Sequence, residues 1–251
     1  MPEKLTFTIN NDFRCFKKGQ VLEFPLYKNL VNYVVGPNGS GKSSLMHFIR
    51  AKRHDLFSEN KSMHDGMTSR DDRFLKDSDD ITVDGLDSFD QIFVLDVVDD
   101  DPLSFNNAAT ASGLIGSGGL AMLEKSRGQK SQMLSSRFIN SIVKITGFSI
   151  QDFNSGKRYD KHPLIIIDEL DEGLDISNQS KFSRLLLNLG TIFNATVICI
   201  CHNFFCIACD EFTGKDTTVW DISDGKIKTI KKYVLEQTGF EIDINPAKNE
   251  S

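Results

Sequence analysis

The chain has 251 residues, of which 39% are hydrophobic and 25% are charged, and its formal net charge is −6. These values are ordinary for a soluble globular protein, and the length allows one large α/β domain or two small ones. No apolar run approaches the roughly 20 residues of a membrane-spanning helix, and the N-terminus lacks the pattern of a secretory signal. We therefore expect a cytoplasmic protein without membrane contact. The negative charge gives no global attraction to nucleic acid.

The first predicted elements are two strands and a strand–helix pair. Residues 5–9 and 20–24 alternate between apolar and polar side chains, which is typical of half-buried strands. Residues 31–35 form an apolar run that predicts a third strand. A helical pattern with Leu45 and Phe48 on one face follows shortly afterwards.

A glycine-rich loop connects this third strand to the helix. It fits the pattern G-x-x-x-x-G-K-[ST] of phosphate-binding loops. The glycines let backbone N–H groups point into one concavity, and the helix N-terminus adds partial positive charge. Lys42 is predicted to reach the β- and γ-phosphates of a nucleotide, and Ser43 to offer its hydroxyl to Mg²⁺. The predicted nucleotide-binding residues of the loop are Gly36, Pro37, Asn38, Gly39, Ser40, Gly41, Lys42, Ser43 and Ser44.

Two further strands are predicted at residues 91–95 and 164–169, and two carboxylates close the second one. A continuous apolar run suits a parallel strand that is covered on both faces. Ligands of open α/β sheets bind at the carboxyl ends of such strands. We therefore expect Asp168 to hold Mg²⁺, directly or through water. Glu169 is expected to polarise the water that attacks the γ-phosphate.

The other predicted elements are helices, a cysteine-containing strand and a hairpin. One helix starts at Gln129, with Leu134, Phe138, Ile142 and Ile145 spaced for one apolar face. Strand 196–201 places Cys199 and Cys201 on the same face, where free cysteine packs as a small hydrophobe. With His202, Cys206 and Cys209, the same spacing allows a zinc site as an alternative interpretation. Asp224-Gly225 predicts a hairpin.

The order of these elements resembles the ATP-binding cassette (ABC) ATPases over roughly residues 5–230. The loop at 36–43 stands where this family has Walker A, and Asp168-Glu169 stands where it has Walker B and the catalytic glutamate. Asp175 looks like the aspartate of the D-loop. His202, just after the cysteine strand, looks like the switch histidine that contacts the γ-phosphate.

A candidate signature motif opens the predicted helix near Gln129. The sequence Ser126-Arg127-Gly128-Gln129-Lys130 resembles the motif usually written LSGGQ, although Arg127 stands where a glycine is usual. In this family the signature of one subunit closes on the ATP of the other, so the resemblance implies that Ser126, Gly128 and Gln129 bind nucleotide in a dimer. Ser117 opens a competing candidate, and Asp96 stands where a Q-loop glutamine is usual.

The segment 168–175 is more similar to the soluble SMC-, RecF- and OLD-like branch than to transport cassettes. The roughly 80 residues between Walker A and the signature carry no heptads, which implies a head without coiled-coil arms. The implied fold is an α/β P-loop NTPase. It has a mostly parallel central sheet, an N-terminal antiparallel β-rich subdomain and a helical signature subdomain.

The predicted organisation is one ATPase domain over residues 1–240, followed by a polar tail at 241–251. Within it, residues 1–100 form the N-terminal β/P-loop lobe, 101–160 the helical signature region and 161–240 the Walker B lobe.

The resemblance implies an ATPase that binds ATP and Mg²⁺, forms an ATP-dependent homodimer and hydrolyses ATP slowly without a partner. Its expected role is a nucleotide-gated clamp or switch in DNA maintenance and repair or in phage–host conflict, with an effector such as a nuclease. DNA contact would use a basic patch at residues 17–18, 52–54 or 226–232, or the partner. Alternatives are the nucleotide-binding subunit of an ABC membrane transporter and a monomeric P-loop kinase.

Overall fold

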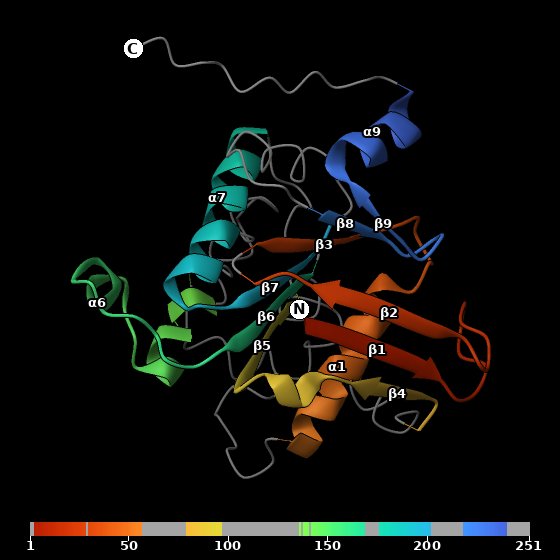
Figure 1. The fold of residues 1–251 in the computed structure, drawn as a ribbon, viewed down its shortest axis with the longest axis horizontal. Coiled ribbons are helices and arrows are strands. Elements are labelled where there is room, and N and C mark those ends of the chain that lie inside the picture. The colour runs from red at the N-terminus through yellow and green to blue at the C-terminus, as the bar shows by residue number, and fades with distance from the viewer. Residues whose placement is uncertain are drawn as a thin grey trace, which may run out of the picture.

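A six-stranded sheet lies at the centre of the part of the chain that the structure describes (Figure 1). The structure is a computed structural model that describes residues 3–28, 30–56, 79–96, 136, 138–140, 142–168, 176–201 and 218–239. In sheet order the strands are β5 (Gln91–Asp96), β6 (Pro163–Asp168), β7 (Thr196–Ile200), β3 (Val31–Val35), β8 (Thr218–Asp221) and β9 (Lys226–Thr229). Neighbours from β5 through β8 pair in parallel, and β9 pairs antiparallel with β8. This confirms the predicted mostly parallel central sheet.

The parallel strands end at one edge of this sheet. Ladder pairing aligns Asp96 with Asp168, Asp168 with Ile200, and Val35 with Asp221. The glycine-rich loop follows Val35 directly, so it starts at the edge where the acidic strand β6 ends. Open α/β sheets bind ligands at this edge.

A separate antiparallel sheet forms from the N-terminal part of the chain (Figure 1). Its strands, in order, are β2 (Val21–Leu26), β1 (Glu3–Ile9) and β4 (Ile81–Asp84). The antiparallel β-rich subdomain is therefore confirmed. Strand β4 was not predicted, because its four residues directly follow a run of aspartates that indicates a loop.

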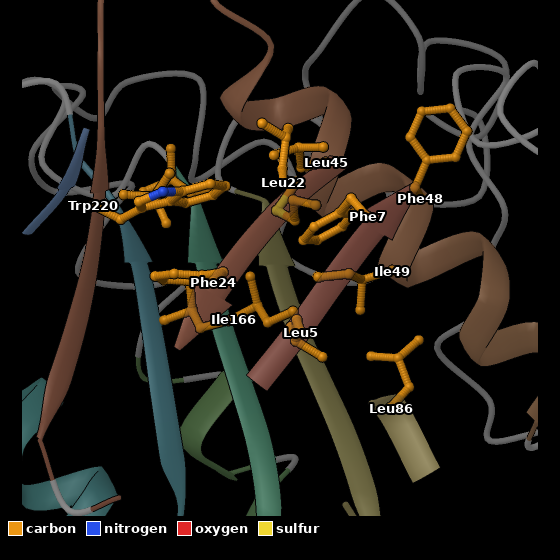
Figure 2. Close-up of a cluster of buried hydrophobic side chains, with 14 of the residues drawn as sticks. Leu5, Phe7, Leu22, Phe24, Leu45, Phe48, Ile49, Leu86, Ile166 and Trp220 are labelled. Atoms are coloured by element: carbon orange, nitrogen blue, oxygen red, sulfur yellow. The ribbon is translucent and has the colours of Figure 1, made fainter. Parts of the chain in front are cut away.

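The N-terminal sheet and helix α1 (Lys42–Leu56) together cover one face of the central sheet. Figure 2 shows the buried layer between them, where Phe7 and Phe24 from the N-terminal sheet meet Leu45 from α1. The Trp220 ring of β8 stacks on Phe24 with ring centroids 4.6 Å apart. Helix α1 is thus packed between two sheets, which fixes the direction in which its N-terminus points.

Helices α7 (Ile176–Ile192) and α9 (Ile230–Thr238) contribute buried side chains to the cluster on the opposite face. Cys199 and Cys201 are buried together in this cluster, as their alternation predicted. Residues 142–146 are helical, and Gly147 follows with φ 63°. The predicted apolar face of this helix is wrong at Ile145, which is 44% exposed, whereas Ile142 is buried in the core. Short helices η1 (Leu86–Ser88) and α6 (Ile150–Asn154) complete the described elements.

A hydrogen-bonded histidine joins the two sheets at the edge opposite to the glycine-rich loop. The His162 Nδ1 atom lies 3.0 Å from Glu3 Oε1 of β1, and its Nε2 atom lies 2.9 Å from Thr196 Oγ1 of β7. The Thr196 hydroxyl also donates to Glu3 Oε2 at 3.4 Å, so the three side chains form one hydrogen-bonded group. Burial lowers the pKa of His162 from its ordinary value, and this outweighs the opposing influence of the Glu3 and Asp90 carboxylates.

The lowered pKa of His162 predicts a loss of stability in mild acid. The unfolded chain binds a proton at this histidine near pH 6.5, before the folded protein does, so stability falls as the pH drops below that value. We expect the melting temperature of the wild type to fall relative to His162→Gln between pH 7.5 and 5.5. Between pH 7.5 and 8.5 the melting temperatures of the wild type and of His162→Gln should change in parallel. For this size of chain, 1 kcal/mol corresponds to about 2–4 °C, and parallel curves in acid would contradict the expectation.

Candidate functional site

The glycine-rich loop between β3 and α1 adopts a backbone that glycine alone accepts without strain. Gly36, Gly39 and Gly41 have φ values of 148°, 81° and 95°. A Cβ atom on Gly41 would lie 2.3 Å from Phe16 Cζ, and one on Gly36 would lie 2.6 Å from Ile222 Cγ2. Side chains are therefore excluded at both ends of the loop, which leaves its main chain close to its neighbours.

The Lys42 ammonium group is held over this loop. Its Nζ atom donates to the carbonyl oxygens of Gly36 at 2.7 Å and Pro37 at 3.1 Å. Lys42 is also the first residue of α1, where the first-turn N–H groups have no partner within the helix and the dipole is positive. A cation and the positive end of a helix therefore converge at the loop, which is the chemistry that a polyphosphate requires.

The serines of the loop differ in their surroundings. The Ser40 hydroxyl oxygen is buried and has no hydrogen-bond partner among the described residues, and Ser43 is partly exposed at the start of α1. Ser44 is buried, and its hydroxyl accepts a hydrogen bond from Arg14 Nη1 at 3.0 Å. The partial exposure of Ser43 at the start of α1 is compatible with the predicted Mg²⁺ role. Because the Ser44 hydroxyl is buried and bonded to Arg14, a contact of Ser44 with a nucleotide would use its backbone N–H group.

Asp168 lies at the carboxyl end of β6 and is 1% exposed. Alternation along the strand puts it on the same face as Leu164 and Ile166, which is the face that α1 covers. Ser43 lies in the first turn of that helix. Carboxylate and hydroxyl oxygens suit Mg²⁺, so these two residues fit the predicted metal site.

The predicted catalytic residues Glu169 and His202 lie outside the described residues, but the strands that lead to them do not. Glu169 directly follows Asp168. His202 follows Cys201, whose N–H donates to the Val34 carbonyl oxygen at 3.2 Å. Both chain segments therefore leave the sheet at the edge where the glycine-rich loop begins.

The remaining predicted nucleotide contacts, Ser126, Gly128, Gln129 and Asp175, also lie outside the described residues, as does the competing Ser117. They stay predictions, together with most of the helical signature subdomain. The Asp96 backbone pairs with Asp168 at the edge of the sheet.

Arg14 lies next to the site although no sequence pattern indicated it. It has a left-handed backbone with φ 52°, which is uncommon outside glycine, and its guanidinium reaches the first turn of α1 at Ser44. Its neighbour Phe16 is 3% exposed and packs on Gly41, and Phe13 packs edge-on against Phe48. Because Phe16 is buried, its ring is not available for stacking on a nucleotide base.

The basic patch predicted at 226–232 is smaller than the sequence indicates. Lys226, Lys231 and Lys232 are exposed, whereas Lys228 is buried and contacts three carboxylates. Lys228 is therefore unavailable to DNA.

Among the helices that the structure describes, none combines the length and apolar character that a membrane crossing requires.

A family model described as "AAA domain" matches residues 8–203, a span that contains the loop, α1 and Asp168. The chain belongs to this family. Together with the parallel sheet and the glycine-rich loop, the match shows that this AAA domain has the P-loop NTPase fold. No curated protein matches the sequence.

Several solved structures are similar to this AAA domain at low sequence identity. They include cbiO1 from Clostridium perfringens, part of the ABC transporter complex cbiONQ (14% identity; 94% of this chain and 92% of that chain; TM-score 0.44). Another is the dimeric ATP-binding cassette MJ0796 bound to ADP and Pi (15%; 90% and 98%; 0.44). A third is a bacterial Atm1-family ABC exporter with ATP bound (15%; 96% and 41%; 0.45).

Two glycines of the loop give a test of its packing. Gly39→Ala and Gly41→Ala both place alanine at a positive φ, which costs about 1–2 kcal/mol in each. Only Gly41→Ala also collides with Phe16, since nothing lies within 4 Å of a Cβ on Gly39. Overpacking costs about 1–3 kcal/mol, so Gly41→Ala should melt about 2–12 °C below Gly39→Ala. Equal melting temperatures by calorimetry would show that the contact with Phe16 is not tight.

Lys42→Ala tests the role of the ammonium group. Loss of a charged hydrogen-bond donor to phosphate should weaken Mg-ATP binding by about 1.5–3 kcal/mol, or about tenfold to 150-fold. Isothermal titration measures this directly. Lys52→Ala is the matched control, because Lys52 lies on the same helix, away from the loop, and should bind like the wild type. Equal affinities of the two variants would remove Lys42 from the site.

Proposed function

We propose that the protein is an ABC-type ATPase of the soluble SMC-, RecF- and OLD-like branch that binds and hydrolyses ATP. The observation that carries this proposal is the position of the Lys42 ammonium group. Lys42 is the first residue of α1, and its Nζ atom lies 2.7 Å from the Gly36 carbonyl oxygen. Asp168 ends a parallel strand of the same sheet, on the face that α1 covers. The family match over residues 8–203 supports the same chemistry.

The residues of the site divide the work of hydrolysis. Lys42 and the N–H groups of the loop bind and orient the β- and γ-phosphates, which accounts for most of the catalysis in phosphoryl transfer. Ser43 and Asp168 hold Mg²⁺, which neutralises negative charge on the phosphates when bound. Glu169 accepts the proton of the attacking water. His202 contacts the γ-phosphate and stabilises the charge that develops there.

We further propose that two copies form the complete site. Ser126, Gly128 and Gln129 would then meet the ATP of the second subunit, and Asp175 would lie close to the contact between the subunits. The reason is chemical, since a helix start carrying a hydroxyl and free N–H groups provides a second anion site for the γ-phosphate. ATP then links the subunits, and hydrolysis releases them. Such a cycle suits a clamp or switch.

The proposed biological role is DNA maintenance and repair or phage–host conflict, with an effector such as a nuclease supplying the output. The resemblance of segment 168–175 to the soluble branch supports this role. DNA contact through the chain itself would use the exposed residues Lys226, Lys231 and Lys232 or the pair at 17–18.

Glu169→Gln tests catalysis and dimerisation together. The amide cannot accept a proton, so this variant should bind Mg-ATP, fail to hydrolyse it and accumulate as a dimer in light scattering. The double variant Lys42→Ala/Glu169→Gln is the control and should stay monomeric at the same ATP concentration. A Glu169→Gln variant that binds ATP but remains monomeric would contradict the dimer and favour the kinase alternative. Co-purification of the trapped protein with an integral membrane protein would favour the transporter subunit.

A further inference from the structure

A buried lysine lies where three elements meet behind the glycine-rich loop. Lys228 of β9 has a side chain that is 6% exposed. Its Nζ atom lies 2.8 Å from Asp221 Oδ2 of β8, 2.9 Å from Asp224 Oδ2 in the hairpin turn and 2.8 Å from Glu236 Oε2 of α9. Asp221 also accepts hydrogen bonds from the Ser223 N–H and hydroxyl groups. One ammonium group therefore connects strand, turn and helix.

The lysine is charged in the folded protein. Burial alone would lower the pKa of Lys228, but hydrogen bonds to Asp221, Glu236 and Asp224 raise it well above its usual range. Burial likewise opposes ionisation of Asp221, yet the hydrogen bonds from Lys228 and Ser223 keep its pKa below the ordinary value. A buried carboxylate needs such partners, so the position of Asp221 depends on Lys228.

Asp221 and the residue after it contact the start of the loop. Asp221 pairs with Val35 in the parallel ladder between β8 and β3. Ile222 donates its N–H to the Val35 carbonyl oxygen at 3.0 Å. The Ile222 side chain lies so close to Gly36 that a Cβ there would be 2.6 Å from Ile222 Cγ2. The Gly36 carbonyl oxygen in turn accepts the hydrogen bond from Lys42.

We propose that Lys228 is a positioning residue for nucleotide binding, which acts through Asp221 and Ile222 on Gly36 and thereby on Lys42. The proposal rests on the proposed function, since it concerns the same site. Glu236 extends the connection to α9, which is anchored by its buried residues Ile230 and Val234. The position of α9 is thereby coupled to the main chain that holds the Lys42 ammonium.

The test compares four variants with the wild type by their dissociation constants for Mg-ATP, measured well below each melting temperature. Coupling through a packed network is worth about 0.5–2 kcal/mol, or about 2- to 30-fold in affinity. Lys228→Met should weaken binding within that range. Lys226→Met removes the same charge from an exposed position on the same strand and should bind like the wild type.

Glu236→Gln separates positioning from long-range electrostatics and perturbs folding less, because Glu236 is 40% exposed. Removing a carboxylate near the site of an anionic ligand would tighten binding if charge alone mattered. Positioning predicts weaker binding instead. The double variant Lys228→Met/Glu236→Gln should be no weaker than Lys228→Met, since Glu236 acts through the lysine.

The outcomes separate this inference from the proposed function. Equal affinity of Lys228→Met and wild type would overturn the positioning role and leave nucleotide binding intact. Equal weakening by Lys226→Met, or tighter binding by Glu236→Gln, would also overturn it, because both indicate a charge effect. A wild-type protein that binds no Mg-ATP would overturn the proposed function and, with it, the inference.

Discussion

The main chain of the glycine-rich loop is clamped from two sides, and the rest of the site depends on that steric constraint. Ile222 from the β8–β9 hairpin packs against Gly36, and Phe16 from the N-terminal turn packs against Gly41. Close-packed contacts of this kind tolerate little displacement. The loop is therefore shaped by segments far away in sequence, and the position of Lys42 follows from theirs.

The N-terminal sheet helps to fix the position of helix α1. Helix α1 buries side chains against the central sheet and against β1 and β2 at once, so its N-terminus is fixed by two layers. The His162 contacts with Glu3 and Thr196 join the same two sheets at the opposite edge. The apolar layer around α1 and the polar contacts of His162 together hold the N-terminal turn, which carries Arg14 and Phe16, against the glycine-rich loop.

Local patterns predicted the parts of this fold that depend on local physics. The apolar runs of β3 and β6, the glycine-rich loop and the hairpin at Gly225 all follow from burial, helix-terminus chemistry and positive φ. Long-range pairing did not follow from them. Strand β7 lies between β3 and β6 although it comes after both in the chain, and no periodicity encodes that insertion. The contact of Arg14 with Ser44 joins residues 30 positions apart, and no local sequence pattern predicted it either.

Lys228 shows why charge patterns mislead in the same way. A lysine-rich stretch indicates a solvated or DNA-binding face, but Lys228 is buried and contacts acids from three elements. The burial of Lys228 also gives the aspartates at the sheet edge different roles. Asp221 is committed to Lys228 and Ser223, so it cannot serve as a metal ligand. Asp168, at the end of β6, lies on the opposite face of the sheet, which is the face that α1 and Ser43 cover.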